Sequence, residues 1–421
     1  MLVSIPYGKS HIHYIADDKT AVLQAAHAEQ AHAKSEAQIV SDAMRSPVSG
    51  APLFELAQGK RNAVIIISDH TRPVPSKWII PPMLAELRRA NASINITLLV
   101  ATGCHRETTA AELADKLGEQ IVAEETISIH DCDNDANMVL LGILPSGAEL
   151  RIHKLAAEAD LLLAEGFIEP HFFAGFSGGR KSVLPGIADR NAVLGNHCAQ
   201  FIASEYAQAG ILSNNPIHED MVVAARLAKL SYIVNVVIDS DKKIVAAFAG
   251  ATEAAHLAGC EFVSRRHSVD AVKADIVIAG NGGYPLDQNI YQAVKGMTTA
   301  AMCNAAGGVI IMLAECSDGI GGDFFYHLLR DCATPQALHA QILSVPQSET
   351  QPDQWQVQIL ARILMEHTAI LVADSKNEAA ITEMKMRYAC NLEHALQQAR
   401  AIKGENASVA VMPDGVSVIV R

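Results

Sequence analysis

Short runs of apolar and β-branched residues recur along this chain, separated by longer stretches rich in Ala, Leu and Glu. The runs that predict strands are 63–67, 94–100, 126–130, 160–164, 232–238, 275–279, 308–313, 369–373 and 409–412. The stretches that predict helices are 78–90, 109–117, 215–230, 251–266 and 377–402. Strands that alternate with helices predict parallel sheets with helices on both faces. We therefore expect an α/β fold with mainly parallel sheets covered by helices.

The length of the chain favours two domains, because 421 residues are many for one. We place the boundary near residue 270, where a predicted helix ends and a new series of strands begins. The first domain is expected to span 1–270 and to be joined by the segment 405–421. The second domain is expected to span 271–404. Half of the residues are hydrophobic, so both domains can bury a substantial core.

Composition also argues against several classes of partner. The formal net charge of −13 disfavours a general nucleic-acid surface or an anionic-membrane surface. The sequence shows no signal-peptide pattern and no apolar run of membrane-spanning length. The eight cysteines form no CxxC pair, which favours a reducing compartment. We therefore expect a cytoplasmic protein that binds neither nucleic acid nor a membrane.

Polar clusters follow four of the predicted strands directly. They lie at 69–73, 102–106, 169–171 and 281–284. In open α/β sheets ligands bind beyond the carboxyl ends of the strands, so the four clusters predict one crevice. Because three clusters belong to the first domain and one to the second, we expect the active site in the cleft between the domains.

The span 171–197 holds the densest group of chemically useful residues, including five glycines. The spacing of Gly175, Lys181 and Ser182 is close to that of a phosphate loop, but Arg180 stands where that motif requires glycine. Three interpretations stay open at this point: a nucleotide-dependent enzyme, a lyase that forms a Schiff base on Lys181, and a glycine-rich surface turn.

Two histidines follow predicted strands and are candidates for proton transfer, His105 and His171. A lone histidine is more often structural, but two at strand ends in one predicted cleft favour catalysis. His197 has no second metal ligand three or four residues away. Any metal bound to His197 would therefore take most of its ligands from elsewhere.

Two further segments carry candidate binding residues. Asp69, Thr71 and Arg72 precede a predicted helix, whose N-terminus would suit an anion, although an aspartate cap with a surface arginine is the simpler interpretation. A second predicted helix starts at the expected cleft and carries Gln288, Tyr291, Gln292 and Lys295 on neighbouring turns.

Taken together, these motifs resemble the nickel-dependent lactate racemase family. The resemblance runs over essentially the full length, through 69–73, 103–108, 171–197 and 281–299, and the glycine-rich central span is the most specific. The family carries a nickel-pincer nucleotide, a pyridinium mononucleotide whose two sulfur-bearing arms and ring carbon hold nickel. The resemblance implies an isomerase, with enzymes that synthesise the cofactor as partners.

The resemblance also implies a role for each cluster. It implies that Lys181 is linked to the cofactor through a thioamide and that His197 supplies the remaining nickel ligand. Arg72 and Lys295 would hold the substrate carboxylate, which a planar guanidinium suits. The other residues implied to line the substrate site are Tyr291, Gln292 and Trp355, and those implied to contact the cofactor are Asp69, Thr71, Arg72, Ser177, Gly178 and Gly179.

The reaction implied is racemisation or epimerisation at C2 of a 2-hydroxy acid. One of His105 and His171 would take the hydroxyl proton while a hydride passes from C2 to the cofactor, and the other would protonate the product. Family members act on lactate, malate, larger 2-hydroxy acids or sugar acids, and these motifs do not choose among them. A phosphate-loop-like enzyme using Lys181 and a non-catalytic carrier of the cofactor remain the alternatives.

Overall fold

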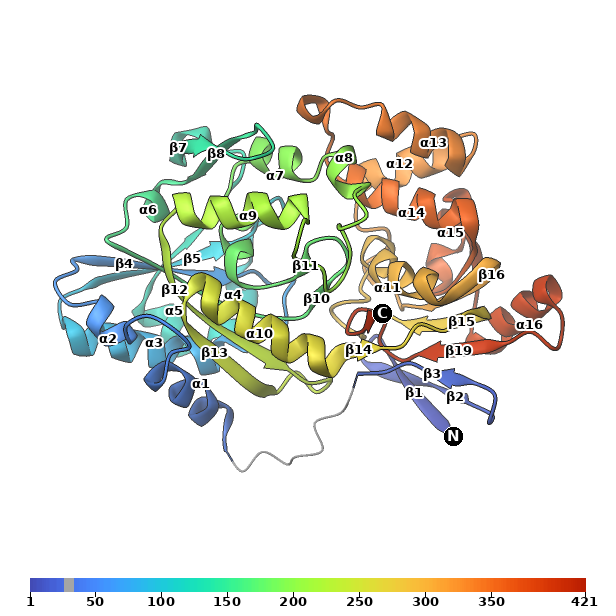
Figure 1. Ribbon diagram of the computed structural model, residues 1–421, viewed down its shortest axis with the longest axis horizontal. Helices are drawn as coiled ribbons and strands as arrows, with labels where there is room; N and C mark the ends of the chain where they lie inside the picture. The colour runs from blue at the N-terminus through green and yellow to red at the C-terminus, as the bar shows by residue number, and fades with distance from the viewer. Residues whose placement is uncertain (26–33) are drawn as a thin grey trace.

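The structure, a computed structural model, describes residues 1–25 and 34–421, which form two layered α/β units (Figure 1). The first unit is built on a six-stranded sheet in the order β13-β12-β9-β4-β5-β6. Its strands are β4 (Asn62–Ser68), β5 (Asn95–Ala101), β6 (Thr126–Ile129), β9 (Leu161–Phe167), β12 (Leu230–Ile238) and β13 (Ile244–Ala251). Neighbouring strands run parallel, except that β12 and β13 are antiparallel.

Strand β4 illustrates why this sheet is buried on both faces. Successive side chains of a strand point to opposite faces. Val64 and Ile66 join one core with helix α9 (Pro216–Leu227), whereas Ile65 and Ile67 join a second core with α3 (Ser76–Ala90). Because both faces are apolar, the strand appears in the sequence as a continuous hydrophobic run, as expected for a parallel strand between two helix layers.

The second unit is built on another six-stranded sheet, in the order β18-β17-β16-β15-β19-β3. Its strands are β3 (Ala21–Val22), β15 (Ala274–Gly280), β16 (Asn304–Leu313), β17 (Thr368–Val372), β18 (Arg387–Ala389) and β19 (Val409–Met412), and every pair is parallel. Helices α11 (Ile290–Cys303) and α14 (Gln354–Glu366) join the core on one face. Helix α16 (Leu392–Lys403) and strand β1 (Leu2–Tyr7), which pairs with β2 (Ser10–Ile15), join the core on the other face. The predicted α/β fold with mainly parallel, helix-covered sheets is confirmed.

The segment 405–421 does not join the first unit as predicted. Its strand β19 pairs with β15 on one side and with β3 on the other, so it lies inside the second sheet. Figure 1 shows β19 beside β3, at the opposite end of the molecule from β4 and β5. The segment reaches back to the first unit at its end, where β20 (Ile419–Val420) pairs with β14 (Ser268–Val269) and where Ser417 and Arg421 form hydrogen bonds with helix α10 (Thr252–His267). Apolar residues alone identify a buried strand but not its neighbours, which explains the error.

The single helix predicted over 377–402 is also wrong. The structure divides it into α15 (Glu378–Glu383), strand β18 and α16. Lys385 adopts a left-handed conformation with φ of 68° between α15 and β18, and β18 then pairs with β17. Pairing at the sheet edge therefore overrides the helical propensity of this stretch.

Three glutamine side chains join the two units near the cleft. Nε2 of Gln358 donates to the carbonyl of Ala199 at 2.9 Å, and Nε2 of Gln347 donates to the carbonyl of Gly195 at 2.9 Å. Gln200 donates in the opposite direction, to a carbonyl of the second unit at 3.1 Å. These bonds fix the second unit against the end of the span 171–197 and against helix α8 (Ala199–Ile202). Within the described residues, no helix has both the length and the apolar character needed to cross a membrane.

Candidate active site

A cavity of about 550 Å³ lies between the two units, where the sequence predicted the site. The first unit contributes the loops that follow β4, β5 and β9, and the second contributes α11 and the start of α14. The predicted site residues that line the cavity are Asp69, Thr71, Arg72, His105, His171, Ser177, Gly178, Lys181, His197, Tyr291, Gln292, Lys295 and Trp355. Residues from opposite ends of the sequence therefore surround one volume, which falls in the usual range for small-ligand sites.

His105 is held by a buried carboxylate from the neighbouring strand end. Its Nδ1 lies 2.7 Å from Oδ2 of Asp69, and Oδ1 of Asp69 accepts the hydroxyl and the amide N–H of Thr71 at 2.7 and 3.1 Å. Burial opposes ionisation of Asp69, but His105, Arg72 and Thr71 outweigh it and hold the pKa of this carboxyl below its usual range. Because a carboxylate only accepts hydrogen bonds, Nδ1 of His105 carries a proton. The neutral ring then has its lone pair on Nε2.

His171 has the opposite arrangement. It lies on strand β10 (Pro170–His171), and the amide N–H of Ala174 donates to its Nδ1 at 3.2 Å. A backbone N–H only donates, so the proton of the neutral ring lies on Nε2. The ring contacts Phe172 and Phe173, with centroid separations of 5.0 and 4.5 Å. Burial, followed by the charges of Lys181 and Lys295, lowers the pKa of His171 well below its usual value, so the ring is uncharged at neutral pH.

Of the basic side chains that line the cavity, three form no ion pair with any residue that the structure describes: Arg72, Lys181 and Lys295. Burial and then Arg72 lower the pKa of Lys295 to about 7, and burial raises the pKa of the nearby Glu169 to about 7. The carboxylate of Asp69 already accepts a hydrogen bond from His105. These basic side chains suit this part of the cavity to anionic ligands such as a carboxylate or a phosphate.

His197 lies at the end of helix α7 (Arg190–Asn196), with Nδ1 3.0 Å from the carbonyl oxygen of Val193. Since a carbonyl oxygen only accepts, Nδ1 carries the proton and Nε2 keeps its lone pair. Burial and then Lys181 lower the pKa of His197 to about 3. Its ring contacts Trp355 at a centroid separation of 4.9 Å. A neutral imidazole with a free Nε2 is the form that binds metals.

The glycines before Lys181 differ in their positions. Gly178 has φ of 74°, and a Cβ there would come within 2.7 Å of Oδ1 of Asn235 and 2.8 Å of the carbonyl oxygen of Phe167, so the loop requires glycine. Gly179 does not line the cavity, and its amide N–H donates to Asn235 at 2.7 Å. Ser177 donates its hydroxyl to the carbonyl of Phe167 at 2.9 Å. Gly179 and the Ser177 hydroxyl therefore brace the loop.

Family models match both parts of the chain. Residues 7–210 match the model described as the lactate racemase N-terminal domain, and residues 269–420 match the lactate racemase C-terminal domain. A lactate racemase from Thermoanaerobacterium thermosaccharolyticum is 53% identical over 421 residues, covering 100% of this chain and 99% of that protein. A lactate racemase from Lactiplantibacillus plantarum is 51% identical over 421 residues, with the same coverage.

This chain belongs to the lactate racemase family. Its structure superposes on that of the lactate racemase apoprotein from T. thermosaccharolyticum with a TM-score of 0.96 over 100% of both chains. A crystal structure of a Thermotoga maritima protein, 18% identical, has a TM-score of 0.69 over 92% of this chain and 98% of that one, and shows the fold alone. As a member of the lactate racemase family, the protein is a racemase and therefore an isomerase.

One of the four predicted polar clusters does not lie at the cavity. The glycine cluster 281–284, expected in the crevice, does not line the cavity. Asn281 instead points inward, where its Oδ1 accepts the amide N–H of Gly296 at 2.9 Å and its Nδ2 donates to the carbonyl of Gln292 at 3.1 Å. This asparagine anchors helix α11, which carries Tyr291, Gln292 and Lys295 to the cavity.

Several residues that line the cavity were not predicted from the sequence. Glu165 is an acid in strand β9, which is otherwise apolar or glycine, and it accepts the hydroxyl of Ser68 at 2.9 Å and that of Ser76 at 3.1 Å. An acid within a buried strand was a signal that could have identified it. Asp353, directly before helix α14, and Gln356 of α14 also line the cavity. Neither has a local sequence signal.

The phosphate-loop interpretation does not match the local structure. Lys181 and Ser182 lie in a 3-10 helix, Gly179–Ser182, whereas a phosphate loop leads into a full α-helix.

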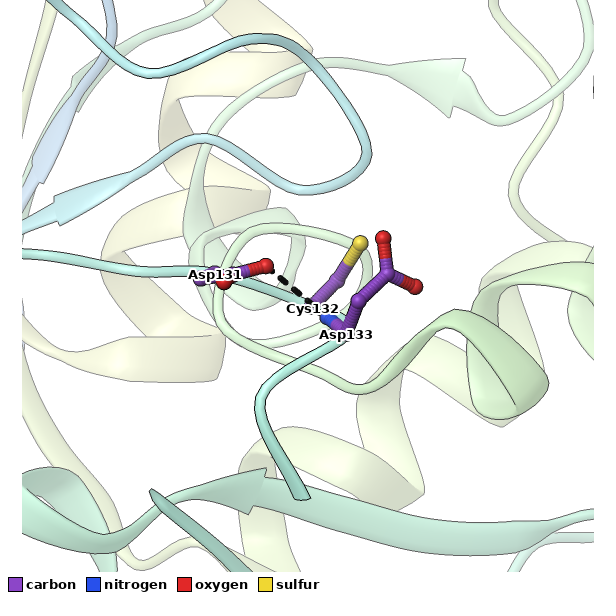
Figure 2. A group of neighbouring side chains, drawn as sticks. All are labelled: Asp131, Cys132 and Asp133. Carbon is purple, nitrogen blue, oxygen red and sulfur yellow. Dashed lines mark hydrogen bonds between the residues drawn. The ribbon is translucent and has the colours of Figure 1, made fainter. Parts of the chain in front are cut away.

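A separate group of possible metal ligands consists of Asp131, Cys132 and Asp133, the one such group of three found within the described residues (Figure 2). Oδ1 of Asp131 accepts the amide N–H of Asp133 at 3.0 Å, as drawn in Figure 2. The carboxylate of Asp133 accepts two hydrogen bonds from Arg190, each 2.6 Å long. These residues form a turn that the ion pair between Arg190 and Asp133 stabilises, and we assign no metal to it.

Proposed function

We propose that this racemase interconverts the two enantiomers of lactate at C2, using a nickel-pincer nucleotide attached to Lys181. The observation that carries the proposal is the set of three basic side chains and two histidines around a single cavity between the units. Full-length similarity to two lactate racemases supports the choice of substrate.

The residues present fit this cofactor. The amine of Lys181 forms no hydrogen bond or ion pair with any residue that the structure describes, and its Nζ lies 5.7 Å from the ring centroid of Phe173. His197 offers a lone pair on Nε2, and Arg72 is available to a phosphate or a carboxylate. When bound, the cofactor supplies an acceptor and donor for the hydride of C2. We assign the attachment to Lys181 and the metal contact to His197.

The side chains of this protein bind the substrate and move its proton. Arg72 and Lys295 bind the carboxylate, and Tyr291, Gln292 and Trp355 line the substrate site. His105 accepts the hydroxyl proton at Nε2, while Asp69 holds its other nitrogen. The resulting 2-keto acid is planar at C2, so a hydride can return to either face.

The tautomers favour unequal roles for the two histidines, which the sequence alone treated as interchangeable bases. His171 carries its proton on Nε2 and donates a hydrogen bond to the substrate oxygen. To act as a base at Nε2, His171 would have to move its proton to Nδ1 and break the bond from Ala174. We therefore assign the proton transfer to His105 and stabilisation of the oxygen to His171.

The experiment that tests the proposal combines intact-mass spectrometry with nickel analysis, on protein produced together with cofactor-synthesis enzymes. We expect a nucleotide-sized adduct on the peptide containing Lys181, about one nickel per chain, and racemisation of lactate. His197→Ala should keep the adduct and lose the nickel. Unmodified, nickel-free protein from that preparation would overturn the cofactor assignment. A loaded protein that does not racemise lactate would overturn the substrate.

A further inference from the structure

The guanidinium of Arg180 lies buried behind the loop that presents Lys181. Arg180 is 2% exposed. Its Nη2 donates to the carbonyl of Ala174 at 2.7 Å, and its Nη1 donates to the carbonyl of Phe176 at 2.8 Å. Nη1 also lies 3.3 Å from the carbonyl oxygen of Gly178. One planar guanidinium therefore binds several carbonyl groups of the segment that leads to Lys181. A lysine ammonium lacks this forked arrangement of donors.

The charge of Arg180 has no carboxylate partner in the part of the chain that the structure describes. Its Nε donates to Nδ1 of His218 at 3.0 Å, and its Nη1 lies 2.9 Å from Nε2 of His256. Burial and then Arg180 lower the pKa of His218 to about 3, so His218 is uncharged at neutral pH. Burial lowers the pKa of Arg180 only to about 10, so this side chain stays charged. Within the described residues, carbonyl oxygens and imidazole nitrogens, with the Cys260 thiol beside His256, surround this buried cation, and no carboxylate does.

Lys181 follows Arg180 directly in the sequence, and its side chain lines the cavity. Burial, followed by the charges of Arg180, Arg72 and Lys295, lowers the pKa of Lys181 well below its usual value. The carboxylates that line the same space are Asp69, Glu165, Glu169, Asp318 and Asp353, and the histidines are His70, His105, His171 and His197. Within the described residues, none of these carboxylates forms an ion pair with the amine of Lys181, and the charges that act on it most strongly are those of cations.

We infer that Arg180 is a positioning residue for covalent attachment at Lys181: its unmatched buried charge selects the uncharged, nucleophilic amine, and its hydrogen bonds hold the loop that presents it. The inference rests on the proposed attachment of the cofactor to Lys181. An uncharged amine has the lone pair that attack on an acyl carbon requires. With a thiocarboxylic acid, the N–C bond forms and the C–O bond breaks. The hydroxyl group and one amine proton leave as water, so no oxidant or reductant is needed.

The inference is tested on the full chain without cofactor, by competitive labelling with a limiting amount of acetic anhydride from about pH 6 to about pH 11. Each labelling event forms an N–C bond, releases acetate and passes the amine proton to water. Peptide mass spectrometry gives the acetylated fraction of Lys181 relative to the exposed Lys19. The pH midpoint of this ratio reports the protonation of Lys181 without any need for activity.

Two substitutions distinguish the effect of the Arg180 charge on Lys181 from the effect of its hydrogen bonds to the loop. Arg180→Gln should raise the midpoint of Lys181 by at least about one pH unit, which is about tenfold less labelling at neutral pH. Because Arg180→Gln also removes bonds within the loop, His218→Glu provides a second test that keeps Arg180 and places a carboxylate beside its Nε. We expect His218→Glu to raise the midpoint and the uncharged His218→Gln to leave it unchanged.

The matched control is Arg226→Gln, which removes an exposed guanidinium that pairs with Glu253 and should not change the labelling of Lys181. A folded Arg180→Gln protein with the wild-type midpoint would overturn the inference, as would equal midpoints for His218→Glu and His218→Gln. The expected shifts in a protein whose Lys181 never takes the cofactor would support the electrostatic role and overturn the attachment alone.

Discussion

The two histidines of the cavity lie in walls of opposite character. The wall around His105 is polar, with its side chain 42% exposed and its Nδ1 held by a buried aspartate. The wall around His171 is formed by apolar aromatic rings, with the basic side chains of Lys181 and Lys295 nearby, and a backbone amide binds its Nδ1. The same residue type therefore presents a lone pair on one side and an N–H on the other. The difference shows that the hydrogen bond to the far nitrogen fixes what each ring offers to a ligand.

The largest expected effects separate these two roles. His105→Ala and His171→Ala should each lower kcat/KM by at least about a hundredfold while the cofactor still loads. His171→Gln, which can still donate an N–H, should retain about tenfold more activity than His105→Gln, which cannot replace the base.

Steady-state rates with each lactate enantiomer check this, with nickel content and adduct mass as controls. The two enantiomers have equal free energy in water, so each variant must lose kcat/KM equally in both directions. Equal losses for the two Gln variants would favour two interchangeable bases. Near-normal racemisation by either Ala variant would remove that histidine from the mechanism.

A smaller effect is expected when the polar wall loses its charge. Asp69→Asn should lower kcat about tenfold to a hundredfold, because an uncharged amide stabilises the protonated His105 ring less well and can orient it wrongly. The control is Asp160→Asn, whose carboxylate accepts the amide N–H of Arg61 at 3.0 Å away from the cavity. Wild-type kcat in Asp69→Asn would show that His105 needs no carboxylate.

The apolar wall should make stability depend on pH. His171 has a lower pKa in the folded protein than the value of about 6.5 expected when unfolded, so the unfolded chain binds more protons below that pH. The free energy of unfolding should therefore fall as the pH drops below about 6.5, by up to about 1.4 kcal/mol per unit from this residue.

Denaturant unfolding of cofactor-free protein between about pH 7.5 and about pH 5 measures this slope. His171→Asn should flatten it, whereas Phe172→Leu should change the stability by a similar amount at every pH. If the slope is unchanged in His171→Asn, the surroundings of His171 do not keep its ring uncharged in the wild-type protein.

The smallest effect is expected at Arg106, which follows His105 in the sequence. Its guanidinium is 59% exposed and donates to the carboxylate of Glu112. Arg106→Gln should change kcat/KM by less than about twofold and stability by less than about 0.5 kcal/mol, as for other exposed ion pairs. A tenfold loss of activity would instead place Arg106 in substrate binding.

The sequence allowed the first sheet and the location of the cavity to be predicted, because both depend on local signals. Strands β4 and β5 are continuous apolar runs, and the polar residues after them meet at one sheet edge. The partner of Asp69 could not be predicted, since His105 lies 36 residues away and only the parallel pairing of β4 with β5 brings them together. The inward orientation of Asn281 and Arg180 could not be predicted either. No feature of the local sequence distinguishes a polar residue that anchors the fold from one that binds a ligand.

The pairing of β3 with β19 has a consequence for how the protein is made. Val22 pairs with Val411, so this edge of the second sheet joins segments that are separated by nearly the whole sequence. The strands of the first sheet, in contrast, all lie between Asn62 and Ala251. Pairing across such a separation is slow, and chains emerging from the ribosome fold their early contiguous parts first. We therefore expect the half of the cavity with Lys181 to form during synthesis and the half with Lys295 to form last. The order of folding would leave Lys181, the proposed attachment site, open to a large cofactor before the cleft is complete.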